Sequence, residues 1–464
     1  MTRAMLFYGH VASNWGDLAI NAGAVELLRR SGVDPAISTA VLISPADMFL
    51  RRATSTLKGL DTLTVPVDGT PRGGREEIEL LTQYLAEPER FAAEVGMADH
   101  DVVILNAGEH LFESAVGENI ADLVWRILPA LAAQATGVPT IQLPATIGPF
   151  RTRLGEQIEQ LLLRGLSAVA YREPESRRIS VGSQTVPVLL DPGFSVPGLK
   201  MPEAPAASER LLGIVLRPED IGIRPGSRRS SFVQKKLRDA AFQDSQAFKL
   251  FAAMAAAHMD RGGRVRVIIQ TRADREISLA LVDQLRNLYP TDSDAVELVD
   301  PSGFREFIES LGSLNALVTS RFHAVILALS QGVPSAGVYS ETHGHKMPGL
   351  FEMLRYPNCA VRLDERNIQS VRTELDNALA QMIEAAPEIS NRIKANRGLT
   401  RRWLSEALEN TTVPEFDTSQ LRIEALAALY RAGLRKFEHE AVSEMRRILR
   451  KLDRPDEELG ADES

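Results

Sequence analysis

Short apolar runs alternate along the chain with longer stretches in which apolar residues recur at helical spacing. Continuous apolar runs of this kind indicate parallel strands that are covered on both faces. A helix is predicted from about Leu18 to Arg30, where apolar residues recur every three or four positions. The strands expected in the first half are Met5–Tyr8, Asp101–Asn106, Pro139–Pro144, Ala168–Tyr171 and Val186–Leu190.

A second series of the same kind follows a proline-punctuated stretch at 197–208, which we interpret as a linker. A helix is predicted over Ser245–Asp260. From Ile389 to Leu452 the pattern is helical, with one break near Thr411–Thr418 at Pro414, and an acidic tail covers 453–464. The strands expected in this half are Leu211–Leu216, Val265–Gln270, Ala295–Val299, Ala316–Thr319 and Ala336–Tyr339.

Alternating strands and helices predict an α/β protein with two Rossmann-like parallel-sheet domains. We expect an N-terminal domain at 1–205, a C-terminal domain at 206–385 and a helical extension with the acidic tail at 386–464. In open parallel sheets, ligands bind at the carboxyl ends of the strands. The residues to consider first are therefore those on the loops that follow the strands.

The amino-acid composition argues against several classes of function. The 464 residues carry a net charge of −8, which disfavours nucleic-acid binding because phosphate neutralisation needs surplus Lys and Arg. Cys359 is the single cysteine, which excludes an intrachain disulfide and a cysteine-cluster metal site. No apolar run approaches the roughly 18 residues that span a bilayer, and no secretory signal is recognisable. We expect a soluble, cytoplasmic protein.

Two loops after predicted strands in the first half contain polar groups. In Asn14-Trp-Gly-Asp17, Asp17 either caps the following helix or joins Asn14 in holding acceptor hydroxyls. In Asn106-Ala-Gly-Glu-His110, the glycine turn either lets a helix N-terminus face an anion or is a solvated loop. Neither loop has the spacing of a dinucleotide or nucleoside-triphosphate site.

Two arginines occupy equivalent places at strand ends in the two halves. Arg172 follows Ala168–Tyr171, and Arg217 follows the strand that starts the second series. Each is either an ion-pairing arginine or a planar fork that binds a phosphate or carboxylate in the cleft.

The strongest element is Thr319-Ser-Arg-Phe-His-Ala324, where an apolar strand ends and an apolar helix begins. A cation at Arg321 and an imidazole at His323, beside Ser320, are suited to anion binding with proton transfer. The alternative is a buried, hydrogen-bonded histidine and a structural arginine. Later, Ser340–Lys346 contains two histidines without an established metal-ligand spacing, so Lys346 is the better candidate there, as a phosphate-binding charge.

Taken in order, these segments resemble the polysaccharide pyruvyl transferase family over about residues 5–355. The resemblance rests on nine segments: Asn14–Asp17, Ile104–Gly108, Pro144–Phe150, Tyr171–Ser176, Asp191–Phe194, Gly213–Arg217, Ser320–Ala324, Gly332–Pro334, and Lys346 before Gly349-Leu350.

The resemblance implies a fold similar to GT-B glycosyltransferases, with the donor pocket between two domains. We expect residues 1–205 to form the acceptor side and residues 206–385 the donor side. The resemblance also implies phosphoenolpyruvate as the donor, a glycan or glycoside as the acceptor, and a cyclic pyruvate ketal and phosphate as products. No metal or other cofactor is implied. Arg321 and His323 match residues that line the family's donor pocket, and Arg172 and Lys346 match its other basic residues.

Two positions depart from the family pattern. The turn Asn106-Ala107-Gly108-Glu109 replaces a run of glycines, and Glu109 adds negative charge beside an anionic donor. It either points away or marks a changed acceptor site. Phe322 replaces an aliphatic residue, and we expect it to alter packing only.

From this we expect His323 to carry the proton and Asp17 to orient or deprotonate the acceptor. A GT-B nucleotide-sugar glycosyltransferase and a non-catalytic scaffold stay open as alternatives. So does the identity of the acceptor. The amphipathic stretch Leu421–Leu434 leaves two further partners open, namely the inner face of a membrane and a second copy of the chain.

Overall fold

The computed structural model describes residues 2–8, 14–43, 54–65, 75–113, 120–180, 185–198, 210–218, 242–340, 345–363 and 366–452. Most of the expected linker, His343 and the acidic tail lie outside these residues.

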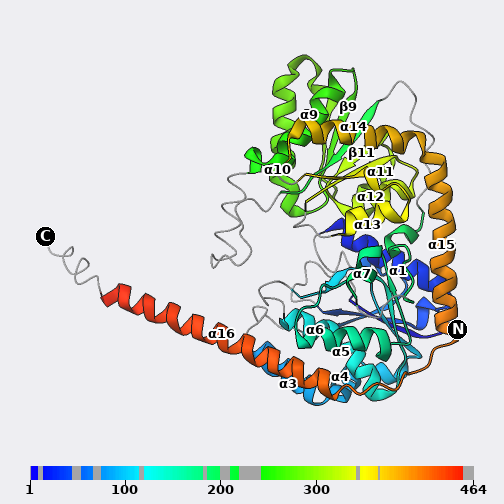
Figure 1. The fold of residues 1–464 in the computed structure, drawn as a ribbon, viewed down its shortest axis with the longest axis vertical. Helices are drawn as coiled ribbons and strands as arrows, with labels where there is room; N and C mark the ends of the chain where they lie inside the picture. Colours follow the sequence, from blue (N-terminus) through cyan, green and yellow to red (C-terminus); the bar gives the residue numbers. More distant parts are fainter. Residues whose placement is uncertain are drawn as a thin grey trace.

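The first half of the chain forms a seven-stranded parallel sheet with the order β3-β2-β1-β4-β6-β5, and β7 pairs with β6. Its strands are β1 (Ala4–Phe7), β2 (Thr39–Ile43), β3 (Asp61–Val65), β4 (Val102–Leu105), β5 (Glu109–Leu111), β6 (Thr140–Ile147) and β7 (Ala168–Tyr171). Its helices are α1 (Trp15–Arg30), α3 (Arg75–Ala86), α4 (Pro88–Glu94), α5 (Ile120–Thr136), α6 (Arg153–Gln160) and α7 (Pro174–Ile179), with a π-helical turn η3 (Leu161–Gly165). These helices cover the sheet (Figure 1).

Strand β6 changes partners in its middle, and this shift places two residues of the site. Its register against β7 shifts between Gln142 and Ala145, on either side of Pro144, which has no N–H to offer a ladder. Beyond the shift, Thr146 pairs with Glu109 of β5. The end of β6 is thus brought between β5 and β7 at the carboxyl edge of the sheet.

The second half forms a six-stranded parallel sheet with the order β10-β9-β8-β11-β12-β13. Its strands are β8 (Leu211–Val215), β9 (Arg264–Ile268), β10 (Val296–Val299), β11 (Ala316–Thr319), β12 (Ser335–Tyr339) and β13 (Ala360–Arg362). Its helices are α9 (Gln246–Met259), α10 (Arg275–Leu288), α11 (Phe304–Gly312), α12 (Phe322–Ser330), α13 (Lys346–Met353) and α14 (Ile368–Glu384). The expected α/β class with two Rossmann-like sheets is confirmed.

One predicted strand is wrong. Residues 186–190 form a single parallel bridge, Tyr171 with Val188, because Pro187 has no N–H with which to extend a ladder. The pattern also missed β2, β3, β5 and β13. The last two are only three residues long, which leaves too few positions for a periodic signal.

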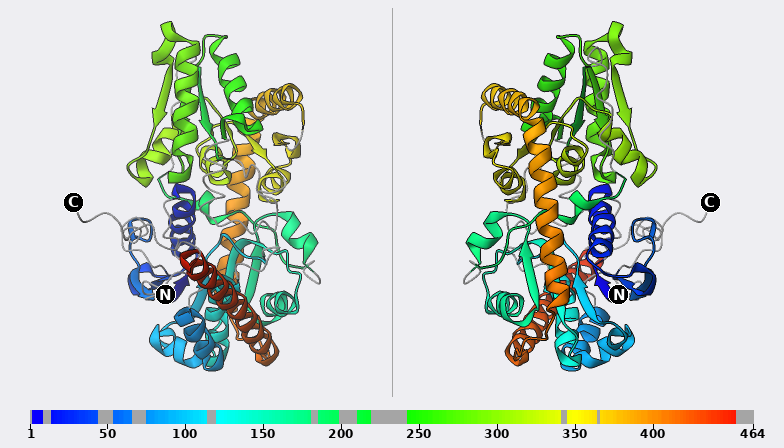
Figure 2. Two further views of the ribbon diagram at one scale, coloured as in Figure 1. Left: turned by 90° about the vertical axis from the view of Figure 1, so that its left-hand side faces the viewer. Right: turned by 90° about the vertical axis from the view of Figure 1, so that its right-hand side faces the viewer.

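The C-terminal helices run back across the molecule. Helix α15 (Ala386–Glu409) extends along both domains, as Figures 1 and 2 show. After the predicted break, α16 (Ser419–Leu452) begins on the first domain, where Leu421 and Leu429 join that domain's core. Arg422 donates to the carbonyl groups of Leu85 and Ala86 at the end of α3.

A hydrophobic cluster joins the two domains. It contains Leu18 and Leu28 of α1 together with Phe307 of α11, Leu327 of α12 and Leu404 of α15, all buried. The two sheets therefore share a core in addition to the chain connection between them. The ribbon views show the two domains stacked one above the other, with α1 and α12 at their junction (Figures 1 and 2).

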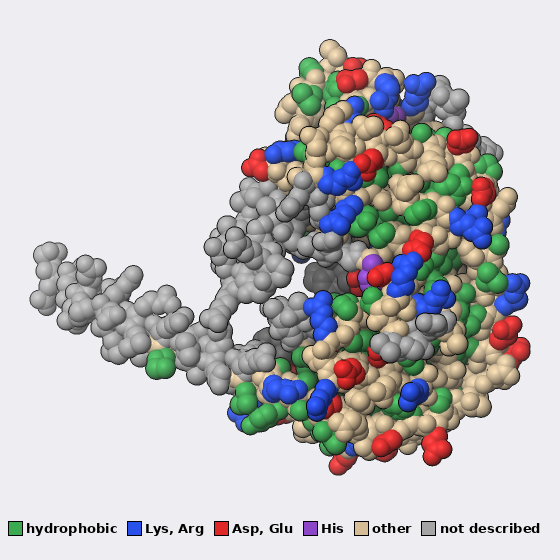
Figure 3. Space-filling model, viewed as in Figure 1, with side chains coloured by type: hydrophobic (Ala, Val, Ile, Leu, Met, Phe, Trp, Pro, Cys, Tyr) green, Lys and Arg blue, Asp and Glu red, His purple; other side chains and the backbone are tan. Residues whose placement is uncertain are grey.

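On the face drawn in Figure 3, acidic and basic side chains are interspersed over the surface. None of the described helices combines the length and the apolar character needed to cross a membrane.

Candidate functional site

The first functional loop ends at the N-terminus of α1. Asn14 is extended, with φ −111° and ψ 111°, and its side-chain oxygen accepts a hydrogen bond from the backbone N–H of Gly16. Asn14 is therefore the N-cap, and Asp17 is the third residue of the helix, in its first turn. Of the two alternatives for Asp17, the helix cap is wrong, because α1 begins at Trp15 rather than near Leu18.

This loop is hydrogen-bonded to the second domain just after the end of β9. The Asn14 side chain accepts a hydrogen bond from Gln270 Nε2 at 2.9 Å, and the Trp15 N–H donates to the Gln270 carbonyl at 3.2 Å. A Cβ at Gly16 would lie 2.7 Å from the Cβ of His323. Glycine is needed here because α1 and α12 approach too closely for a side chain.

Arg172, at the end of β7, is buried in the interior of the site with an exposed fraction of 2 %. Its Nε donates to Thr146 Oγ1 at 2.8 Å, and its Nη1 donates to Asp191 Oδ2 at 2.7 Å. The guanidinium carbon lies 4.9 Å from the centre of the Phe322 ring. The expectation that Phe322 alters packing only is therefore wrong, because its ring forms a cation–π contact with a site arginine.

Asp191 lies between Arg172 and His323, the predicted proton carrier. His323 Nε2 is 3.8 Å from Asp191 Oδ2, and Asp191 Oδ1 accepts the Gly193 N–H at 2.7 Å. Burial alone would raise the pKa of Asp191, but His323 and Arg172 together hold it well below its usual value. Within the described part of the chain, the buried His323 Nε2 has no hydrogen-bond partner. Among the described residues, its nearest acidic neighbour is the Asp191 carboxylate, at a distance too long for a hydrogen bond.

Arg321 is the N-cap residue of α12, and its side chain turns toward the start of α10. Its Nε donates to Asp274 Oδ2 at 3.0 Å, and its Nη2 donates to the other carboxylate oxygen of Asp274 and to Thr271. Asp274 is fully buried. The structure therefore places Arg321 in a two-point ion pair that fixes the β9–α10 turn. The same turn contains Thr271, which forms an antiparallel β-bridge with Asn14.

Ser320 and Arg217 meet at the ends of β11 and β8. The hydroxyl oxygen of Ser320 accepts the backbone N–H of Arg217 at 3.0 Å, and Ser320 itself is buried. Ser320 thus fixes the main chain from which the Arg217 side chain extends.

Lys346 starts α13 and contacts the first domain. Its Nζ donates to Glu109 Oε2 on β5, and the neighbouring His345 lies 3.1 Å from Glu173 Oε1. Glu109 thus points toward the basic side chains. The idea that the turn at 106–110 starts a helix facing an anion is wrong, because residues 109–111 pair as a strand with β6.

The structure thus brings Arg172, His323 and Asp191 together, with Lys346 and Glu109 across the same junction. Gln270, which is hydrogen-bonded to Asn14, and His323 both lie against Gly16. Asp191, Gln270 and Glu173 were not among the predicted site residues. Two of the family-like segments, Asp191–Phe194 and Tyr171–Ser176, contain Asp191 and Glu173 and were available as signals, but no sequence pattern indicated Gln270.

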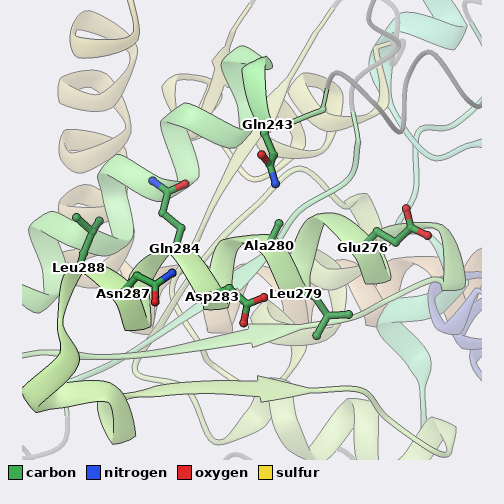
Figure 4. Close-up of a pocket in the computed structure, with 8 residues that line it drawn as sticks. All are labelled: Gln243, Glu276, Leu279, Ala280, Asp283, Gln284, Asn287 and Leu288. Carbon is green, nitrogen blue, oxygen red and sulfur yellow. The ribbon is translucent and has the colours of Figure 1, made fainter.

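Two pockets lie away from this constellation. One, of about 630 Å³, is lined by α10 and by Gln243 of the turn Phe242–Asp244 before α9, with amide, carboxylate and apolar side chains (Figure 4). None of its lining residues is cationic, so it is unsuited to a phosphate. The other, of about 760 Å³, lies between α1 and α11. Among the described residues, no three His, Cys, Asp or Glu side chains group as metal ligands do.

Comparison with solved structures identifies the arrangement of the domains. The UDP-GlcNAc 2-epimerase of Neisseria meningitidis bound to UDP-GlcNAc matches with a TM-score of 0.53 at 12 % identity, over 89 % of this chain and 100 % of that chain. The MnaA–UDP structure from S. aureus has a TM-score of 0.50 at 12 % identity, over 86 % and 98 %. At these identities the likeness concerns the fold alone. It agrees with the expected GT-B-like arrangement, which together with the helical C-terminal segment is confirmed.

Sequence comparison identifies the family. No curated protein shows significant sequence similarity to the chain. The family model described as polysaccharide pyruvyl transferase, however, matches residues 14–342. This range runs from the N-cap of α1 to beyond β12, and it contains Arg172, Asp191 and His323. With a match over most of its length, the chain belongs to the polysaccharide pyruvyl transferase family.

Proposed function

We propose that the protein transfers the pyruvyl group of phosphoenolpyruvate to two hydroxyls of a sugar, forming a cyclic ketal and releasing phosphate. The observation that carries this proposal is the buried constellation of Arg172, Asp191 and His323 at the domain junction, with His323 Nε2 lacking a hydrogen-bond partner among the described residues. A fixed cation beside an available imidazole is what an anionic donor that must be protonated requires.

Donor binding is assigned to the basic residues on both sides of the junction. Arg172 comes from the first domain, and Arg217 and Lys346 come from the second. The charges of Arg172 and Arg217 both lower the pKa of Lys346, which supports the assignment of the three cations to one anion. The N-terminus of α13, where Lys346 lies, adds the positive end of a helix dipole. Arg321 is engaged by Asp274, so we assign it to holding the β9–α10 turn.

In the proposed chemistry, His323 delivers a proton to the methylene carbon of the donor, which makes C2 electrophilic. The first hydroxyl oxygen then bonds to C2, and its proton returns to His323. The second hydroxyl oxygen bonds to C2 as the bond from C2 to the phosphate oxygen breaks, and the second hydroxyl proton leaves with the phosphate. Arg172 and Lys346 stabilise the charge that moves onto the departing group. Asp17, in the first turn of α1, is our candidate for orienting the acceptor.

Replacing His323 tests this proposal. We expect His323→Ala to abolish phosphate release while phosphoenolpyruvate still binds, because the arginine and lysine remain. Phosphate release and calorimetric binding would be measured on the same preparation, with His258→Ala as the control, since His258 bonds the Arg210 carbonyl instead. Near-normal turnover by His323→Ala would refute the assignment.

The two alternatives predict different readouts. A nucleotide-sugar glycosyltransferase would release a nucleoside diphosphate when it is given a nucleotide sugar. A non-catalytic scaffold would bind no phosphoenolpyruvate although Arg172, Lys346 and His323 are intact. Incubating the wild-type protein with each donor class in turn therefore separates the three functions.

A further inference from the structure

Two carboxylates of the first domain meet the first turn of α13 in the second domain. Glu109 contacts Lys346, and Glu173 contacts His345. Glu173 is fully buried, and its oxygens also accept hydrogen bonds from Thr146 and Ser176. Glu109 differs, because its side chain is 32 % exposed and Lys346 is the partner the structure gives it. Of the two, Glu109 has the more exposed side chain and fewer partners among the described residues.

The surroundings of Lys346 explain why a carboxylate is needed there. Burial lowers the pKa of Lys346, and Arg172 and Arg217 act in the same direction, whereas Glu109 opposes them. Burial would raise the pKa of Glu109, but Lys346, Arg172 and His345 together lower it. Glu109 is therefore the ionised group that faces Lys346, while Asp191 and Glu173 face the neighbouring Arg172 and His345.

An anionic ligand of these cations would supply the same negative charge. Two anions close together repel each other, so a bound phosphate or carboxylate and the Glu109 carboxylate cannot both lie against Lys346 without cost. The side chain of Lys346 is 21 % exposed, so an incoming group can reach it.

We propose that Glu109 is an internal competitor of the donor, which holds Lys346 until an anionic group of the donor displaces it. The identity of the donor rests on the function proposed above, whereas the competition between Glu109 and an anion for Lys346 does not. Glu109 thereby sets the donor affinity of this chain. When a binding group is engaged elsewhere most of the time, the apparent affinity equals the intrinsic affinity multiplied by the fraction of molecules in which the group is free.

Removing the charge of Glu109 tests the proposal. We expect Glu109→Gln to bind phosphoenolpyruvate about tenfold more tightly than the wild type, and inorganic phosphate more tightly as well, by isothermal titration calorimetry. In a Lys346→Met background the same substitution should change the dissociation constant less than twofold. Glu175→Gln is the matched control, because it removes a carboxylate of the same domain that pairs with Arg178 instead.

The outcomes separate this inference from the proposed function. If both anions bind but Glu109→Gln binds neither more tightly, the competition is refuted and the donor assignment stands. If only inorganic phosphate binds, and Glu109→Gln binds it more tightly, the competition stands and the donor assignment fails. Binding of neither anion by any variant refutes both. Should Glu109→Gln not fold, Glu109→Asp, with its charge one methylene further back, is expected to tighten binding by a smaller factor, and unchanged binding would refute the competition.

Discussion

Asp191 holds a negative charge inside the protein, and two basic side chains account for its stability there. Its side chain is 1 % exposed and lies against Arg172 from the first domain and His323 from the second. A buried ion pair adds little net stability as a whole, but removing one partner leaves the other charge buried without compensation. Asp191 is thus a positioning residue for both groups of the site.

We expect Asp191→Asn to lower the free energy of unfolding by about 3–5 kcal/mol, because Arg172 then stays buried without its carboxylate. Urea denaturation at pH 7 would measure this loss. The exposed pair of Glu175 and Arg178 provides the comparison, since Glu175→Gln should cost less than about 1 kcal/mol. Equal effects of the two substitutions would contradict the role given to Asp191.

The same substitution predicts a pH dependence. The pKa of Asp191 is lowered in the folded state, so its contribution is complete above the unfolded pKa of about 3.9 and is lost as the pH falls toward the folded value. The difference in unfolding free energy between the wild type and Asp191→Asn should be constant above about pH 5 and shrink below about pH 4. A difference that did not change down to pH 3 would argue against an ionised Asp191.

At the scale of elements, the site depends on how closely two helix N-termini approach each other. Helices α1 and α12 belong to different domains, and Gly16 of α1 lies directly against His323 of α12. The capping oxygen of Asn14 also accepts from Gln270, so one side chain both starts α1 and contacts the second domain. The position of the imidazole therefore depends on the contact between these two helices.

We expect Gly16→Ala to lower kcat/KM by about a hundredfold, because the new Cβ would lie 2.7 Å from both the His323 Cβ and Gln270 Nε2 and would force the helices apart. Steady-state phosphate release would measure the loss. Gly398→Ala in α15 is the control, since a Cβ there meets nothing within 4 Å. Full activity in Gly16→Ala would mean that the approach of the helices does not position the site.

The start of α16 changes the interpretation of the C-terminal helices. The expected amphipathic stretch Leu421–Leu434 buries Leu421 and Leu429 against the first domain, and Arg422 binds the carbonyl end of α3. Ile423, Tyr430 and Leu434 remain exposed on this helix. A membrane or a second copy as a partner therefore stays a proposal, and it concerns the exposed residues rather than the buried ones.

At the scale of the whole molecule, the interdomain cluster couples the two sheets. The cluster combines Leu18 of the first domain with Phe307 and Leu327 of the second domain and Leu404 of the bridging helix α15. These side chains bury one another. Domains that are linked only by a small polar interface move and unfold separately, whereas a shared apolar core opposes this.

We therefore expect thermal unfolding in a single cooperative transition, with the calorimetric and van't Hoff enthalpies in agreement. Leu327→Ala should lower the Tm of that transition without splitting it, because the cavity weakens a core that both domains share. Differential scanning calorimetry of both proteins measures this. Two resolved transitions in the wild type would contradict the coupling.

The apolar pattern was sufficient for most elements of the fold but for only part of the site. Arg172 and His323 could be predicted because each follows a strand whose apolar run is recognisable. Asp191 follows a run that Pro187 keeps from becoming a strand, and Gln270 was counted as part of a strand that ends at Ile268. Local sequence gives no information on which side chain another domain brings nearby.

The sequence by itself determined the two α/β halves, the helical C-terminal segment and the positions at which cations follow strands, because these features depend on periodicity within a few neighbouring residues. The tertiary structure alone decided which carboxylate each of these basic groups faces. It paired Arg321 with Asp274, placed Asp191 between Arg172 and His323, and set Glu109 against Lys346. These contacts join residues that are 19 to 237 positions apart in the sequence. The packing of the two sheets brings such residues together, and a local sequence pattern contains no information on it.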